Sequence, residues 1–260
     1  MGAVAWADRG LVRLVTLANP SKRNALDFEG LLELEEACLA AARDRVRCLV
    51  FRGAGDRAFS AGFDIGALPR SGGAGERPDE AVERAMEAVE AVPCPTIAFV
   101  NGAAYGAGAE LAVTCDLRVA APGASLGMPP ARLGVVYSAA GLRRFLSLLG
   151  PARTRELFFT ARPVGAEEAL SLGLVDRVVA AADAEAAALA LAEEIAGNAP
   201  LAVQGMKRIL RLLESAHERG LTDGEREEVS DLRRRAFESA DLAEGRAAFL
   251  EKRPPRFTGA

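Results

Sequence analysis

The hydrophobic pattern divides the chain into two regions, and this division limits the folds that it can adopt. Up to about residue 180, short β-rich runs alternate with helical patterns. The β-rich runs cover residues 11–17, 46–51, 96–100, 117–120 and 174–179. From residue 184 onward only amphipathic helical patterns recur, at residues 184–196, 202–216, 223–237 and 241–249. The pattern predicts an α/β core with a helical tail, and a helix over residues 28–42 that Asp27 N-caps.

Composition favours a globular protein without a charged macromolecular partner. Half of the 260 residues are hydrophobic, which is enough for a sizeable core, and the net charge of −4 does not favour nucleic acid. The first residues lack a continuous apolar stretch, so we expect a cytoplasmic protein that is not bound to a membrane. Four scattered cysteines without CxxC spacing predict buried reduced thiols and no metal site.

Two segments rich in small residues are the strongest functional signal. They are residues 59–65 (FSAGFDI) and residues 101–112 (NGAAYGAGAELA), and each follows an apolar β-rich run. At strand exits their backbone N–H groups can point outward and converge on one ligand oxygen, which would form an oxyanion hole. Taken alone, such runs are more often tight turns or sites of close packing between a helix and a sheet.

These segments, with residues 19–26 (NPSKRNAL) and 115–120 (CDLRVA), resemble the crotonase (enoyl-CoA hydratase/isomerase) superfamily over nearly the whole chain. The resemblance implies an α/β fold, a spiral of ββα turns followed by a helical C-terminal region. It implies a core over residues 1–200 with an acyl-CoA site, and a region over residues 201–260 for trimer assembly and CoA contact. The expected partners are an acyl-CoA thioester and further copies of the chain, as a homotrimer or a dimer of trimers. No cofactor is implied beyond the coenzyme A of the substrate.

By the same resemblance, the backbone N–H groups of Ala61 and Ala107 hold the thioester oxygen while an enolate forms. Glu110 matches the first catalytic glutamate of the hydratases. Without the family resemblance, we would interpret Glu110 as a carboxylate near a helix N-terminus that is stabilised by the helix dipole.

The second hydratase glutamate is replaced by Pro130, which places ordinary hydratase and isomerase chemistry in doubt. Tyr137 lies in the loop where the methylmalonyl-CoA decarboxylases, a subgroup that the chain especially resembles in its motifs, also carry a tyrosine. Phe63, however, stands where that subgroup has a histidine. We therefore expect a lyase that decarboxylates a malonyl-type CoA thioester. A hydratase or isomerase, a non-catalytic acyl-CoA-binding protein and a purely structural role for Tyr137 remain alternatives.

The resemblance also implies a set of residues that contact coenzyme A. Residues 68–78, rich in glycine, proline and charge, could form a lid over the acyl pocket. The CoA-binding candidates are Lys22, Ala25, Gly62, Asp64, Ile65 and Lys252.

Two other motifs point elsewhere. Residues 123–127 fit the GxSxG pattern, and Asp176 and His217 follow Ser125 in the order of an α/β-hydrolase triad, but the serine is not followed by a helix start. Residues 106–108 lack the third glycine of a dinucleotide fingerprint, so no nicotinamide cofactor is expected.

Overall fold

The computed structural model describes residues 2–67, 77–180, 183–215, 222–225, 227–228, 231, 235, 238–251, 253 and 255–260. Its larger sheet has six strands in the order β1-β2-β3-β5-β7-β10, parallel except for the β1–β2 hairpin. These strands are β1 (Val4–Arg9), β2 (Val12–Leu17), β3 (Cys48–Gly53), β5 (Thr96–Val100), β7 (Leu117–Ala120) and β10 (Arg177–Val178). β3 and β5 are apolar and almost wholly buried, as expected for central strands covered on both faces.

A smaller sheet of four strands runs in the order β4-β6-β8-β9. Its strands are β4 (Ala58–Ser60), β6 (Ala103–Tyr105), β8 (Ser125–Gly127) and β9 (Val164–Gly165). Each successive turn of chain adds one strand to the larger sheet, one to the smaller sheet and then a helix, as in β3-β4-α2 and β5-β6-α3. This is the predicted spiral of ββα turns. The pattern analysis did not find the smaller sheet, because strands of two or three residues show no period.

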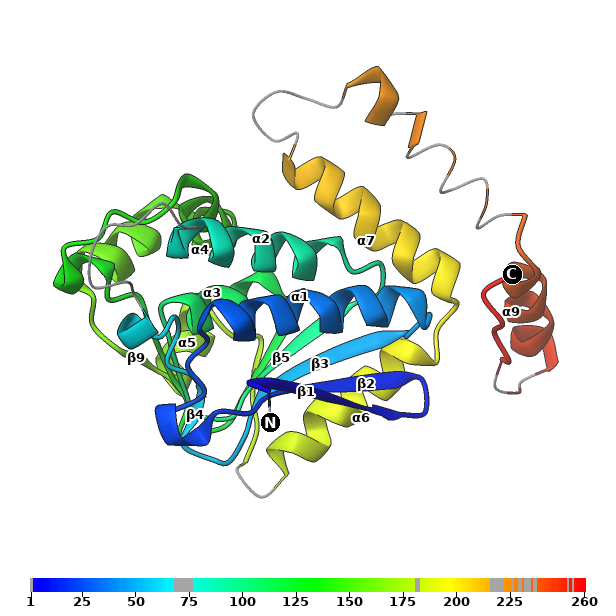
Figure 1. The fold of residues 1–260 in the computed structure, drawn as a ribbon. Helices are drawn as coiled ribbons and strands as arrows, with labels where there is room; N and C mark the ends of the chain where they lie inside the picture. The colour runs from blue at the N-terminus through cyan, green and yellow to red at the C-terminus, as the bar shows by residue number, and fades with distance from the viewer. Residues whose placement is uncertain are drawn as a thin grey trace.

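Helices cover both faces of the larger sheet (Figure 1). α1 and α3 lie on one face with α2 packed against them, and α6 lies on the other. The helices are α1 (Phe28–Arg43), α2 (Pro78–Ala91), α3 (Ala107–Thr114), α4 (Ala139–Thr160), α5 (Ala166–Leu172), α6 (Ala184–Ala196), α7 (Pro200–Ser215) and α9 (Ala240–Glu251). α1 begins as predicted, because the Asp27 carboxylate accepts a hydrogen bond from the Gly30 amide at 2.9 Å.

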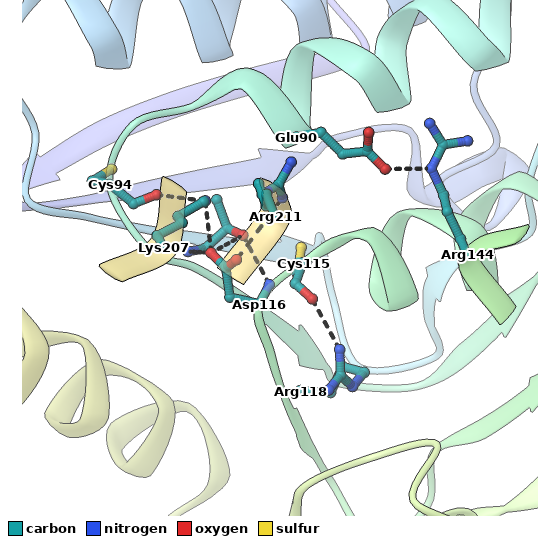
Figure 2. Close-up of polar contacts among 9 residues, drawn as sticks. Glu90, Cys94, Cys115, Asp116, Arg118, Arg144, Lys207 and Arg211 are labelled. Atoms are coloured by element: carbon teal, nitrogen blue, oxygen red, sulfur yellow. Dashed lines mark hydrogen bonds and ion pairs between the residues drawn. The ribbon is translucent and has the colours of Figure 1, made fainter. Parts of the chain in front are cut away.

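A buried lysine attaches the helical tail to the core. Lys207 of α7 donates to the carbonyl oxygen of Cys94 at 2.8 Å and to the Asp116 carboxylate at 2.7 Å, as Figure 2 shows. Asp116 also accepts from the Thr96 amide at 2.7 Å, so the buried charge of Lys207 faces a hydrogen-bonded, half-buried carboxylate. α7 is thereby held against the chain that enters β5 and β7.

The four cysteines are free and buried, as predicted. Burial raises the pKa of Cys94 to about 11 and those of Cys38 and Cys115 to about 12, so these thiols are protonated at neutral pH. Among the described residues, no single helix has the length and apolar composition to cross a membrane. A bent pair, Ala184–Ala196 with Pro200–Glu214, meets that test by length and composition alone.

Candidate active site

The two small-residue segments meet at the carboxyl end of the smaller sheet. β4 and β6 pair in parallel, which brings the chain after each strand to the same edge. Gly62 has a φ of +92°, and a Cβ there would lie 2.5 Å from the Tyr105 carbonyl oxygen and 3.0 Å from the Ala107 nitrogen. Only glycine permits this conformation and this approach, so residue 62 brings the first segment against the start of α3.

Backbone hydrogen bonds show which amides in this region are already used. The Ala61 amide donates to the Arg23 carbonyl oxygen at 2.9 Å, so the prediction that Ala61 offers its N–H group to a ligand is wrong. Leu26 donates to Gly62 at 2.9 Å and accepts from the Asp64 amide at 2.8 Å, in a parallel bridge opposite Phe63.

In such a bridge the N–H group of Phe63 points away from Leu26, and no acceptor for it lies among the described residues. The Ala107 amide, at the first position of α3, likewise has no acceptor in the described part of the chain. The pair of amides available to a ligand is therefore Phe63 and Ala107. The predicted donor was therefore two residues too early, because the positive φ of Gly62 turns the chain between Ala61 and Phe63, which the sequence does not display.

Glu110 lies in the first turn of α3, and its residue surface is 1% exposed. The Tyr137 hydroxyl donates to its Oε2, and Nη1 of Arg144 donates to its Oε1 at 2.9 Å. Arg144 also donates through Nε to Glu90 of α2 at 2.7 Å. The Tyr137 ring packs against Phe158, with ring centroids 5.5 Å apart. Sequence analysis singled out Glu110 and Tyr137, and the structure brings them into direct contact.

The electrostatics of this cluster follow from its burial. Desolvation raises the pKa of Glu110, opposed by the hydrogen bond from Tyr137 and by the charge of Arg144. The pKa of Tyr137 lies well above 10, because burial and the neighbouring carboxylate both disfavour the phenolate. Tyr137 is accordingly a neutral hydrogen-bond donor at physiological pH. Burial opposes the charge of Arg144, but Glu90 and Glu110 outweigh it and the pKa of Arg144 is raised.

By the family resemblance Pro130 stands where a hydratase would carry its second carboxylate, and both this position and Phe63 are apolar. Pro130 is buried at the first position of a 3₁₀ helix, Pro130–Leu133. The Phe63 ring meets Phe28 edge-on, with centroids 5.2 Å apart. Gly141 is a residue that sequence analysis missed: a Cβ there would lie 2.5 Å from the Tyr137 ring and 2.9 Å from Glu110 Oε1. Only the absence of a side chain at position 141 leaves room for their contact.

The candidate CoA residues form a second group beside the bridge. Lys22 and Asp64 make an ion pair of 2.6 Å, with the lysine side chain 59% exposed. This pairing lowers the pKa of Asp64, chiefly through the hydrogen bond from Lys22. Ala25 is buried, whereas Ile65 is 57% exposed. Lys252 and residues 68–76 of the expected lid lie outside the described residues.

The alternative hydrolase triad is not assembled at a nucleophile elbow. Ser125 lies within strand β8, and its hydroxyl contacts the Tyr105 hydroxyl at 3.0 Å. Asp176 is paired with Arg118 at 2.9 Å. His217 lies outside the described residues. An elbow requires a sharp turn from strand to helix at the serine, and residue 125 begins a strand instead.

Comparisons with known proteins agree with this geometry. The family model for enoyl-CoA hydratase/isomerase matches residues 8–260. The chain belongs to the enoyl-CoA hydratase/isomerase family. It is 35% identical to methylmalonyl-CoA decarboxylase of Escherichia coli, covering 92% of this chain and 91% of that protein. It is 37% identical to a probable enoyl-CoA hydratase of Mycobacterium tuberculosis, covering 96% of both.

The structure of an enoyl-CoA hydratase/carnithine racemase from Magnetospirillum magneticum superposes with a TM-score of 0.92 at 32% identity, covering 100% of this chain and 97% of that one. The predicted crotonase fold is thus confirmed, and the chain is an acyl-CoA-processing enzyme of this family. Relatives of about equal identity carry decarboxylase and hydratase names, so the reaction must be argued from the site.

Proposed function

We propose that this enzyme decarboxylates a malonyl-type CoA thioester. The observation that carries the proposal is the partner of Glu110. Its buried carboxylate faces the phenol of Tyr137, and the residue in place of a second carboxylate is Pro130. Syn addition of water to an enoyl thioester is best served by two acid–base groups, whereas loss of CO₂ requires an electron sink and a proton source.

The electron sink is the pair of amides at Phe63 and Ala107, which would hold the thioester oxygen. The C–C bond to the carboxylate breaks, its electrons form the enolate, and CO₂ leaves. One proton then goes to the α-carbon. Glu110 would take up that proton from solvent when the substrate binds, since burial and the nearby substrate carboxylate both raise its pKa, and would then relay the proton through water.

Tyr137 would orient the substrate carboxylate. In the structure its hydroxyl donates to Glu110, so binding requires the O–H bond to turn from Glu110 to the substrate. Being neutral, the phenol can hold a carboxylate without the strong ground-state attraction of a cation. The apolar ring of Phe63, packed on Phe28, disfavours the charged carboxylate and accommodates neutral CO₂.

A mass-spectrometric assay of the purified protein with methylmalonyl-, ethylmalonyl-, malonyl- and crotonyl-CoA tests the proposal. We expect a decarboxylated product from at least one malonyl-type thioester, and loss of that product in Ala107→Pro. Hydration of crotonyl-CoA alone would favour a hydratase. Two observations support that alternative: the presence of Glu110 and the 37% identity to a probable hydratase. Binding of all four thioesters without any product would indicate a non-catalytic acyl-CoA-binding protein.

The proposed assembly is a homotrimer or a dimer of trimers. α7 exposes an apolar stripe of Met206, Leu210 and Leu213, which are 57%, 59% and 49% exposed and share one helix face. Burial of this stripe between copies of the chain would stabilise an oligomer. Light scattering of the wild type and of Leu210→Asp tests it, and a monomeric wild type would refute it.

A further inference from the structure

Arg144 joins the candidate active site to a charge on another helix. It is 7% exposed, and its guanidinium spans two carboxylates: Glu110 of α3 at 2.9 Å and Glu90 of α2 at 2.7 Å. Figure 2 shows Glu90 reaching from α2 to Arg144 on α4. A planar guanidinium with several fixed donors can serve both carboxylates at once, which a lysine cannot do with the same geometry.

Both side chains that bind Glu110, those of Tyr137 and Arg144, come from the start of α4. The Ser138 hydroxyl caps the helix by accepting from the Gly141 amide at 3.1 Å, so Tyr137 immediately precedes the cap. Arg144 follows Gly141 by three residues and therefore lies on the same face of the helix. The phenol binds Oε2 and the guanidinium binds Oε1, so one helix end determines how the Glu110 carboxylate is rotated.

Several charged groups act on Glu110, and Arg144 differs from the others in the sign of its charge. Glu83 of α2 raises the pKa of Glu110, in the same direction as burial, whereas Tyr137 and Arg144 lower it. Among the groups that the structure describes around Glu110, Arg144 is the cation whose charge lowers the pKa of Glu110 and so counteracts the effect of burial. Glu90 adds a further negative charge on the far side of Arg144.

Arg118, which lies on β7 just after α3, is paired with other groups. Arg118 of β7 donates to the Cys115 carbonyl oxygen at 2.9 Å and pairs with Asp176 at 2.9 Å. Its charge is therefore balanced away from the Glu110 carboxylate, and the ionisation of Glu110 depends on α4.

We propose that Arg144, held in place by Glu90, is a positioning residue that keeps the Glu110 carboxylate ionised in the free enzyme and directs its Oε2 to the Tyr137 hydroxyl. The inference rests on the proposed function, because that function gives Glu110 and Tyr137 their catalytic roles. Its test does not require turnover. Glu90 and Arg144 also line a groove of about 1150 Å³ between the core and α7. The ion pair between them therefore links Glu110 to this groove.

The chain contains only two tyrosines, which makes the contact directly observable. In protein labelled with ¹³C at the tyrosine Cζ, the Tyr105→Phe variant identifies the Tyr137 resonance. That resonance shifts when its acceptor changes from a carboxylate to a carboxylic acid, so its midpoint against pH reports the protonation of Glu110. The transition due to Glu110 is the one that Glu110→Gln removes.

We expect the midpoint in Arg144→Gln to rise by about one pH unit or more, as is typical when a close opposite charge is lost. Arg144→Lys, which keeps the charge, should return most of that shift. Glu90→Gln should not raise the midpoint, because it removes a negative charge while leaving an acceptor for Arg144. Arg143→Gln and Glu87→Gln are matched controls, since both side chains line the same groove, and they should behave as the wild type.

An unchanged Tyr137 midpoint in folded Arg144→Gln would overturn the proposal, as would an equal rise in Glu90→Gln. If Arg144→Gln does not fold, a midpoint in Arg144→Lys that differs from the wild type by as much as one unit overturns it instead. A purely structural ion pair between α2 and α4 would lower stability without moving this midpoint. If no malonyl-type thioester is decarboxylated but the midpoints move as described, the proposed function fails and the positioning role stands.

Discussion

Removal of the Tyr137 hydroxyl should destabilise the protein in a pH-dependent way. Tyr137→Phe deletes one oxygen and leaves the ring packed on Phe158, so the packing contribution is nearly unchanged. What is lost is a hydrogen bond to a buried carboxylate, Glu110, which is 1% exposed. Hydrogen bonds to charged groups contribute about 1.5–3 kcal/mol. For a chain of this size, each kcal/mol corresponds to roughly 2–4 °C in Tm, so we expect a decrease of about 3–12 °C at neutral pH.

The pH dependence separates this explanation from a general packing defect. The Tyr137 hydrogen bond lowers the pKa of Glu110, so it stabilises the ionised carboxylate more than the neutral acid. The cost of Tyr137→Phe should therefore be largest at pH 8 and should shrink as Glu110 becomes protonated at lower pH. Chemical denaturation at a series of pH values measures it.

Tyr105→Phe is the matched control. Its hydroxyl contacts the neutral Ser125 hydroxyl at 3.0 Å, so its cost should be about 0.5–1.5 kcal/mol and independent of pH. In the decarboxylation assay, Tyr137→Phe should lose at least tenfold in rate, about 1.4 kcal/mol, with unchanged affinity for an acyl-CoA that cannot lose CO₂. An equal loss of stability at all pH values together with wild-type decarboxylation would refute the reasoning.

Three further predictions concern the same site. Ala107→Pro should fold, because proline is tolerated at the first position of a helix, but turnover should fall about 10²-fold or more with the loss of one amide. Glu110→Gln should abolish turnover yet be at least as stable as the wild type at pH 8. The raised pKa means that Glu110 favours the folded state below its unfolded pKa and loses that contribution as pH rises through the folded pKa. Any advantage of Glu110→Gln should therefore vanish near pH 4, and denaturation at both pH values tests this. Because Pro130 is not an acid or base, hydration of crotonyl-CoA should be far slower than the turnover of an efficient enzyme, which is about 10²–10³ per second. A measured hydration rate in that range would contradict this prediction.

The sequence was sufficient for what depends on local pattern. The strands at residues 96–100 and 117–120 were predicted with the bounds that the structure has, since their apolar runs are buried on both faces. The Asp27 cap was likewise correct, because capping uses a side chain and an amide three residues apart. The family resemblance added Glu110 and Tyr137 as candidates.

Only the tertiary structure decided which groups face one another. Ala61 was predicted as an oxyanion donor, but its amide binds Arg23, and the free amide belongs to Phe63. That choice depends on strand pairing across some forty residues of sequence, which no local pattern encodes. Arg144 was not predicted at all, because an arginine on an amphipathic helix is usually a solvated residue. Its burial between Glu90 and Glu110 arises from the packing of α4 against α3 and from the ion pair with Glu90 of α2, and this arrangement sets the charge of the candidate active site.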